Sequence, residues 1–254
     1  MKRVLILYHS GVTNTRMVAE KVFHRIYNTF DTKMYSVEQM PCDIELNEYD
    51  SIVIGFPTIH ATPSKRILEF INGFSKLTKP LPAFIFTTCG LCSANTLRIF
   101  AKHCIAKNII PVLNSSYRCS ATDGALIAPW MDILFRHEKG LDEKIDKDCA
   151  CYIKLIQSNH IQLSVPRFKL YSIINYPNKF LGQHLPIKIY LHKNKCIKCE
   201  KCIHNCPSAA LTKDNDVYPK YIAQNCEKCL RCIHKCPQLA LSLSKKKTPR
   251  RVLS

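Results

Sequence analysis

The sequence predicts a doubly wound α/β fold, in which a five-stranded parallel sheet is covered by helices and followed by a small α+β domain. Four observations support this fold class. Apolar runs alternate with helical patterns over the first 160 residues, and two cysteine-rich repeats lie near the C-terminus. The length of 254 residues suits about two domains. With 46% hydrophobic and 22% charged residues, the composition is typical of a globular protein.

The strands of the predicted sheet are mostly short apolar runs, which indicates burial on both faces. Strands are expected at Val4–Tyr8, Lys33–Val37, Ser51–Phe56, Ala83–Thr88 and Ile109–Ser116. The segments between them place apolar residues at helical spacing. Helices are expected at Thr15–Phe30, Ser64–Phe74, Ala94–Lys107 and Glu138–Gln157. Parallel sheets of this kind bind ligands at the carboxyl ends of their strands.

The C-terminal cysteines form an internal duplication. Residues 196–207 have the pattern C-x2-C-x2-C-x3-C-P, and residues 226–237 repeat it thirty positions later. Three thiolates at this spacing on a tight loop can hold three corners of one iron–sulfur cubane, while the fourth cysteine begins a short helix and points away. Zinc is the alternative, but zinc sites usually combine paired C-x2-C elements with four ligands in all. The repeats therefore favour two [4Fe-4S] clusters.

These repeats resemble the two-cluster ferredoxins of bacteria, over about residues 188–243. The resemblance implies that the fourth cysteine of each repeat ligates the cluster of the other repeat. The implied ligands of cluster I are Cys196, Cys199, Cys202 and Cys236. The implied ligands of cluster II are Cys226, Cys229, Cys232 and Cys206. Such ferredoxins often have glycine after the second cysteine, where this chain has Glu200 and Leu230.

The loop after the first predicted strand is rich in hydroxyl groups and runs into a helix. It consists of Ser10, Gly11, Val12, Thr13, Asn14 and Thr15. Its hydroxyls and the N–H groups of the helix start form a candidate phosphate site, with a simple helix N-cap as the alternative. The loop resembles the FMN phosphate loop of flavodoxins, roughly [ST]-x-T-G-x-T, in its first hydroxyl, its asparagine and its last threonine. Val12 stands where threonine is usual, and Thr13 where glycine is usual.

Two further loops lie where flavodoxins hold the flavin ring. They contain Pro57, Thr58, Ile59 and His60 in the first loop and Thr88, Cys89 and Gly90 in the second. The usual stacking aromatic is missing, and His60 is the nearest substitute, although an ordinary surface histidine is the alternative. Gly90 would let the backbone approach the flavin. Cys89 and Cys92 have the spacing of a redox dithiol, but we interpret them as incidental.

The other cysteines lack ligand spacing and are predicted to be inert: Cys42, Cys104, Cys119, Cys149 and Cys151. The odd total of 15 cysteines argues against a disulfide framework. Neither a G-x-x-x-x-G-K motif nor an acid–base pair is visible, so nucleoside triphosphate chemistry is not expected and no catalytic residue is assigned.

The net charge of +18 is uneven, with +4 in residues 1–160 and +14 in residues 161–254. Such a field can attract nucleic acid, an anionic membrane or an acidic protein. The negative charge of two clusters would offset much of it, and no nucleic-acid motif is visible, so nucleic acid is not an expected partner. No apolar run is long enough for a membrane span and no secretory signal is visible, which predicts a cytoplasmic protein.

The expected organisation is a flavodoxin-like FMN-binding domain at 1–160, a connector at 161–187, a ferredoxin domain at 188–243 and a basic tail at 244–254. The tail, with Lys245–Lys247, is predicted to be a solvated end; docking of an acidic partner is the alternative.

The whole chain resembles the flavodoxin–ferredoxin fusion proteins of anaerobic bacteria and archaea. This resemblance implies electron transfer between FMN, two [4Fe-4S] clusters and a redox partner protein. One alternative is a reductase that acts on a small molecule directly at its flavin. Another is a ferredoxin whose flavodoxin domain has lost FMN and serves for docking, a hypothesis motivated by Val12 and Thr13.

Overall fold

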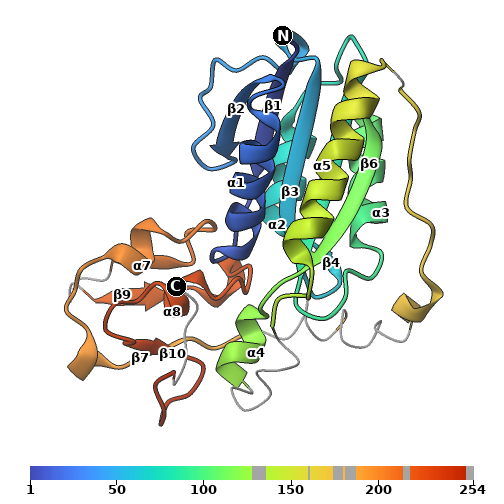
Figure 1. Ribbon diagram of the computed structural model, residues 1–254. Helices are drawn as coiled ribbons and strands as arrows, with labels where there is room; N and C mark the ends of the chain where they lie inside the picture. Colours follow the sequence, from blue (N-terminus) through green and yellow to red (C-terminus); the bar gives the residue numbers. More distant parts are fainter. Residues whose placement is uncertain (128–135, 160, 174–179, 181–186, 214–217, 250–254) are drawn as a thin grey trace.

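The computed structural model describes residues 1–127, 136–159, 161–173, 180, 187–213 and 218–249. Figure 1 shows an α/β unit with a second, smaller unit at one end of its sheet. Parts of the predicted connector (174–179 and 181–186) and of the predicted tail (250–254) lie outside the described residues.

The central sheet confirms the predicted class. Its parallel strands follow the order β2-β1-β3-β5-β6. The chain adds β2 on one side of β1 and the later strands on the other side, as in flavodoxin-like sheets. They are β1 (Arg3–Tyr8), β2 (Asp31–Ser36), β3 (Ser51–Ile59), β5 (Leu81–Cys89) and β6 (Ile109–Arg118). A two-residue strand, β4 (Thr62–Pro63), pairs antiparallel with the end of β3 and is too short to show as a sequence pattern.

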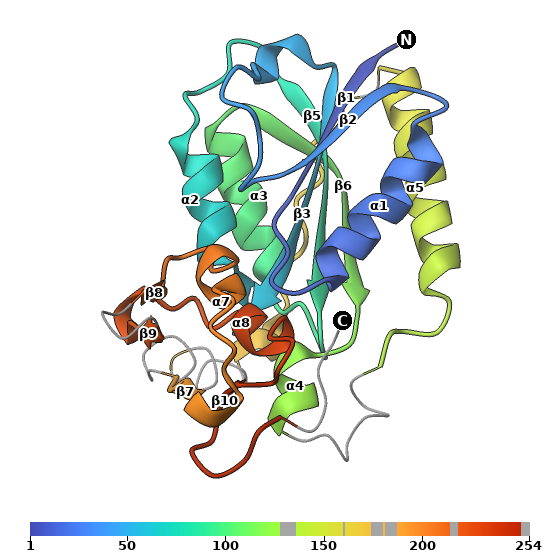
Figure 2. The ribbon, with the colours of Figure 1, turned by 90° about the vertical axis from the view of Figure 1, so that its left-hand side faces the viewer.

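Helices cover both faces of this sheet. In Figure 2, α1 (Asn14–Ile26) and α5 (Leu141–Gln157) lie on one side, and α2 (Lys65–Gly73) and α3 (Thr96–Ala106) lie on the other. The first helix ends at Ile26 and not at Phe30, because the chain turns there to enter β2, and the Phe30 side chain is buried in the core at 2% exposure. Lys21 and Arg25 of α1 form ion pairs with Asp142 and Asp146 of α5.

Several short helices were not predicted. They are α4 (Thr122–Ile127) and the 3₁₀ helices η1 (Leu46–Glu48), η3 (Leu170–Ile173), η4 (Lys193–Lys195) and η5 (Ala223–Asn225). Of these, α4 follows the carboxyl end of β6 and therefore lies at the edge of the sheet where a ligand is expected.

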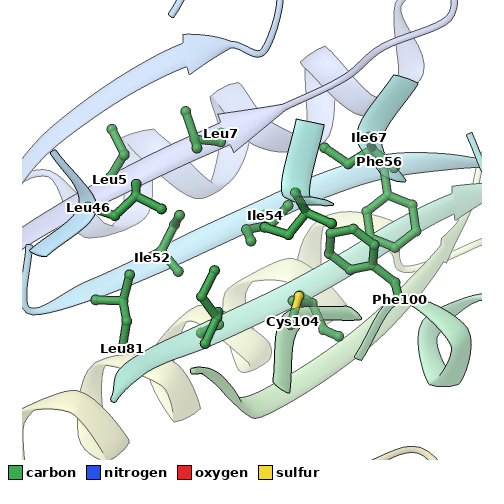
Figure 3. Packing of buried hydrophobic residues seen from close by; sticks show 14 of the residues in the cluster. Leu5, Leu7, Leu46, Ile52, Ile54, Phe56, Ile67, Leu81, Phe100 and Cys104 are labelled. Atoms are coloured by element: carbon green, nitrogen blue, oxygen red, sulfur yellow. The ribbon is translucent and has the colours of Figure 1, made fainter. Parts of the chain in front are cut away.

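The core lies on both faces of the sheet, and alternate residues of each strand serve opposite faces. Leu5 and Leu7 join the cluster beneath α2 and α3, whereas Val4 and Ile6 join the cluster beneath α1 and α5. Figure 3 shows residues of the first cluster, including Phe56 and Phe100. The centroids of these two rings lie 4.3 Å apart. Burial on both faces explains why these strands are continuously apolar.

The two cysteine repeats build the same short unit twice. The first contributes β7 (Tyr190–Leu191), α7 (Lys201–His204) and β8 (Leu211–Lys213); the second contributes β9 (Pro219–Tyr221), α8 (Arg231–His234) and β10 (Leu241–Ser242). Strand β7 pairs antiparallel with β10, and β8 pairs antiparallel with β9. Each unit thus completes a two-stranded sheet with the other.

The two repeats share an unusual backbone conformation at the residue after the second cysteine. Glu200 has a φ of 56° and Leu230 a φ of 61°, so both adopt the left-handed conformation. Because glycine adopts this conformation without steric cost, the geometry explains why related ferredoxins often have glycine after the second cysteine.

The described part of the connector packs along the α/β unit. The Ser164 N–H donates to the Pro111 carbonyl at 2.7 Å, and the Arg98 guanidinium donates to the Pro166 carbonyl at 2.9 Å. These bonds carry the chain back along β6 and α3. Within the described residues, no helix is long and apolar enough to cross a bilayer.

Gly55 in β3 is expected to tolerate no side chain. A Cβ at this position would lie 2.1 Å from Cζ of Phe86, whose ring is fully buried, so Gly55→Ala should lower the free energy of unfolding by about 1–3 kcal/mol. Gly73→Ala is the matched control, because a Cβ there has no neighbour within 4 Å. Urea unfolding followed by circular dichroism measures both variants, and equal stabilities would contradict the packing argument.

Candidate functional site

The hydroxyl-rich loop after β1 lies at the carboxyl edge of the sheet, where α1 begins. All the residues predicted to bind FMN, except Thr13, line one cavity at this edge. Within the loop, the Asn14 amide donates to the Ser120 carbonyl at 2.7 Å, and the Thr15 hydroxyl lies 2.7 Å from that of Thr88. These bonds tie the loop to the ends of β5 and β6.

The loop has unused donors that fit a phosphate group. The Ser10 hydroxyl is buried and has no hydrogen-bond partner among the described residues. Helix α1 has no side-chain cap at Thr13, so N–H groups of its first turn remain available. A buried hydroxyl and free backbone N–H groups suit a phosphate at the start of a helix. The substitutions at Val12 and Thr13 leave these donors in place.

The two predicted ring-binding loops face the same cavity. Pro57, Thr58 and Ile59 form the carboxyl end of β3 and His60 follows it, and the Thr58 hydroxyl lies 2.9 Å from that of Thr87. His60 has a φ of 48° in the tight turn between β3 and β4. Burial, and then the positive charge of Lys228, lower the pKa of His60. The imidazole is therefore neutral at pH 7, with one nitrogen as donor and one as acceptor.

Gly90 and Cys89 also line the cavity. A Cβ at Gly90 would lie 2.6 Å from Cβ of Ala121, so this glycine allows two cavity loops to pack closely. Burial raises the pKa of the Cys89 thiol to about 11, whereas Cys92 is exposed. A thiol with so high a pKa is a poor nucleophile near neutral pH, and Cys89 therefore lacks the low pKa typical of the attacking thiol of a redox dithiol.

A fourth loop was missed by the sequence analysis. Ser120, Ala121, Thr122 and Asp123, at the end of β6 and the start of α4, line the cavity as well. Their position directly after the fifth predicted strand was a usable signal, since ligands bind at the carboxyl ends of such strands.

The second cysteine repeat forms the remaining wall of the cavity. Lys228, Cys229 and Leu230 line it, together with Ile187. A Cβ built on Gly11 would lie 3.5 Å from Cβ of Cys229, so the phosphate loop and the cysteine loop are in contact. No sequence pattern indicates this contact, because it depends on how the two units pack.

Arg231 joins the two units. Its Nε donates to the Gly11 carbonyl at 2.7 Å, and Nη2 donates to the Ser10 carbonyl. The same guanidinium lies 3.3 Å from a carboxylate oxygen of Glu38 and donates to the Asn205 carbonyl at 3.1 Å. Arg231, which directly precedes Cys232, thus holds the phosphate loop against the second cysteine repeat.

Buried ionisable groups surround this contact. His9 donates from Nδ1 to Glu38 at 2.7 Å, and its Nε2 lies 4.0 Å from a Glu227 oxygen. Burial disfavours the Glu38 carboxylate, but the hydrogen bond from His9 and the charges of His9 and Arg231 outweigh it and lower the pKa to about 2. Burial raises the pKa of Glu227, while His9 opposes this shift. The ionised Glu38 is therefore the carboxylate that pairs with Arg231.

The other cavity of interest lies inside the cysteine-rich unit. It is lined by Cys196, Cys199, Cys202 and Cys236, the four residues implied as ligands of cluster I. The rest of its wall is largely apolar and includes Leu191, Pro219 and Leu241. Among the described residues, no three His, Cys, Asp or Glu side chains converge on a single metal ion. Four thiols spread around a cavity fit a cubane.

The implied ligands of cluster II also come together. The Cys232 thiol interacts electrostatically with Cys229, Cys226 and Cys206, and also with Cys202 of the first repeat, so the fourth cysteine of the first repeat lies near the cysteines of the second. The Ala210 N–H donates to Cys206 Sγ at 3.1 Å, and the Ala240 N–H donates to Cys236 Sγ at 3.2 Å. Such N–H···S bonds stabilise thiolate ligands and tune the reduction potential of a cluster.

Cys89 is expected to resist alkylation. Because its pKa of about 11 leaves little thiolate at pH 8, iodoacetamide should modify it about a hundredfold more slowly than the exposed Cys42. Peptide mapping by mass spectrometry under anaerobic conditions measures both rates, with unfolded protein as the control in which they become equal. Equal rates in the folded protein would show that Cys89 is an accessible, reactive thiol.

Comparison with known proteins identifies both units. A flavodoxin domain family matches residues 5–116, and a 4Fe-4S dicluster domain family matches residues 188–237. No curated protein matches the chain by sequence.

Solved structures similar to this chain include flavodoxins. A flavodoxin from the domain Archaea is 16% identical, with a TM-score of 0.45, over 61% of this chain and 99% of its own. Oxidised flavodoxin 1 from Bacillus cereus is 16% identical, with a TM-score of 0.46, over 60% and 97%. An NADH:FMN oxidoreductase in its apo form is 11% identical, with a TM-score of 0.47, over 66% and 97%.

The first family match covers the sheet with the hydroxyl-rich loop, and the second covers the duplicated cysteine unit. A flavodoxin domain implies FMN as cofactor, and a 4Fe-4S dicluster domain implies iron–sulfur clusters. The chain therefore joins an N-terminal flavodoxin domain to a C-terminal 4Fe-4S dicluster domain of the ferredoxin type, and it is an electron-transfer flavo-iron-sulfur protein.

Proposed function

We propose that this protein passes electrons between FMN, two [4Fe-4S] clusters and a partner oxidoreductase. One observation carries the proposal: Cys229, an implied cluster II ligand, lines the same cavity as the phosphate loop. In this proposal residues 1–160 bind FMN, residues 161–187 connect the domains, residues 188–243 hold the clusters and residues 244–254 form the tail. Bound FMN supplies one- or two-electron chemistry, and the clusters supply one-electron chemistry.

The flavodoxin domain would bind FMN through three loops. Ser10 to Thr15 would hold the phosphate, while Pro57 to His60 and Thr88 to Gly90 would flank the ring. The neutral imidazole of His60 can donate or accept a hydrogen bond. Leu230, which is 3% exposed, would exclude water from the side of the cavity that faces the cysteine loop.

The ferredoxin domain would hold its clusters with ligands from both repeats. Cys196, Cys199, Cys202 and Cys236 would bind cluster I, and Cys226, Cys229, Cys232 and Cys206 would bind cluster II. Lys228 and Arg231 place positive charge beside the wall that the two domains share. Positive charge near a redox centre favours its reduced form and therefore raises its potential.

The proposal is tested first by counting cofactors in protein purified without oxygen. We expect about eight iron, about eight sulfide and one FMN per chain. About two zinc ions with negligible sulfide would overturn the cluster assignment. Iron and sulfide without flavin would favour the alternative hypothesis, a ferredoxin whose flavodoxin domain has lost FMN and serves for docking. Rapid turnover of a small-molecule acceptor without another protein would favour a direct reductase.

Ser10→Ala should weaken FMN binding about tenfold, because a buried hydroxyl loses its charge-assisted hydrogen bond to the phosphate. Ser64→Ala is the matched control: the Ser64 hydroxyl is also buried without a partner among the described residues, but it lies outside the cavity wall. Fluorescence titration of the flavin-depleted protein with FMN gives both affinities. A similar loss of FMN affinity in the two variants would show that Ser10 does not bind the phosphate.

Arg231→Met should loosen the phosphate loop from the cysteine loop. The loss of charged hydrogen bonds to the Ser10 and Gly11 carbonyls should cost about 1–3 kcal/mol, and amide hydrogen exchange in residues 10–15 should speed up about tenfold. Lys201→Met is the matched control, since Lys201 holds the same position in the first repeat and is exposed. Unchanged exchange in the Arg231 variant would show that this residue does not join the domains.

A further inference from the structure

The two cysteine repeats share a backbone but differ in their surroundings. Leu230 and His234 of the second repeat are 3% and 4% exposed, and His234 lies 3.0 Å from the Thr122 carbonyl of the flavodoxin domain. The residue in the first repeat that corresponds to His234 is His204, whose side chain is 75% exposed. The second repeat therefore packs against the flavodoxin domain at His234, while the corresponding His204 of the first repeat faces outward.

The residue after the first cysteine differs between the repeats in both type and exposure. In the second repeat it is Glu227, whose side chain is 3% exposed beside His9. In the first repeat it is Ile197, an apolar residue that is 60% exposed. Two residues further along each repeat, Cys199 is exposed whereas Cys229 lines the flavodoxin cavity. A chain with two nearly identical loops has thus kept one for an internal contact and left an apolar residue uncovered on the other.

Lysines precede and follow Ile197 in the chain, and two of them, Lys198 and Lys201, line the same cavity as Ile197. Lys193 and Lys198 both approach the ring of Tyr218, at 5.0 and 4.6 Å from its centroid, so they lie on the same face. Lys195 and Lys201 are exposed as well. The nearby carboxylate, Glu200, is engaged by Lys213 and His204. We call Lys193, Lys195, Ile197, Lys198 and Lys201 the port surface.

Part of the port surface lines the cavity implied for cluster I. Ile197, Lys198 and Lys201 line that cavity together with Cys199. An exposed apolar residue with a rim of charge is typical of a protein interaction site, and a positive rim selects a negative partner. The flavodoxin domain covers the corresponding part of the second repeat.

We propose that the port surface is the docking site of an acidic one-electron carrier protein. This inference rests on the proposed function and adds the route that electrons take. The second repeat exchanges electrons with the flavodoxin domain, and the first repeat exchanges them with the external partner. At each contact one electron leaves one redox centre, which is oxidised, and enters the other, which is reduced, and no bond is made or broken. The lysine rim steers the partner, and Ile197 supplies the apolar contact.

The first test uses the unaltered holoprotein and an acidic plant-type [2Fe-2S] ferredoxin as the probe. A carbodiimide forms amide bonds between paired lysines and carboxylates, and mass spectrometry locates them. We expect cross-links at Lys193, Lys195, Lys198 and Lys201. Cross-links mainly at flavodoxin-domain lysines would overturn the proposal, and this result does not depend on any variant.

The second test compares two double variants of equal charge. Lys193→Glu with Lys201→Glu should weaken ferredoxin binding about tenfold or more at low salt, as measured by calorimetry. Lys147→Glu with Lys154→Glu changes the same net charge on exposed positions of α5, and should weaken binding less than about twofold. Equal losses would mean that only net charge matters and would overturn the docking site.

Two further readouts separate the possible failures. The visible spectrum of each variant must show intact clusters; where it does not, the cross-link map of the unaltered protein decides. Equal binding of a basic c-type cytochrome, or binding of anionic vesicles but not ferredoxin, would overturn the proposal. If FMN and both clusters are present but cross-links map elsewhere, the port surface is wrong and the proposed function stands. If the cofactors are absent, the proposed function itself is wrong.

Discussion

The contact between Arg231 and the phosphate loop is the constraint on which the arrangement of the two domains depends. The guanidinium of Arg231 donates to the carbonyls of Ser10 and Gly11, and Arg231 itself directly precedes Cys232 in the chain. Backbone carbonyls cannot move without moving the loop, so the hydroxyl-rich loop after β1 and the cysteine loop are positioned by the same side chain. Glu38 strengthens the contact because its carboxylate, with a pKa of about 2, stays ionised throughout the physiological range.

The duplicated unit shows how one backbone can serve two environments. Both repeats place a non-glycine residue at a positive φ after the second cysteine, but Glu200 is partly exposed and paired with Lys213, whereas Leu230 is buried in the domain interface. The cysteines and prolines that shape the loop are the same in each copy. The side chains between them differ, and these decide which copy faces the flavodoxin domain.

The strands, the main helices and the loops at the sheet edge were predictable, because alternation of apolar runs and turn residues is a local property of the chain. The end of α1 was not, since Phe30 continues the helical spacing although its side chain packs into the core after the turn. The loop at Ser120–Asp123 had only its position as a signal. The wall made by Lys228, Cys229 and Leu230 could not be predicted, because it arises from long-range packing between residues about 220 positions apart.

The cavity lined by Cys196, Cys199, Cys202 and Cys236 takes three side chains from one half of the duplication and one from the other. Strands β7 and β10 pair across the same division. A single half would therefore leave both its cavity and its sheet incomplete. Before the duplication, a peptide of about this half-length would have needed a second identical molecule to enclose its cubanes, and joining the two in tandem removed the dependence on concentration. It also freed each half to mutate separately, which a symmetric pair of identical molecules cannot do.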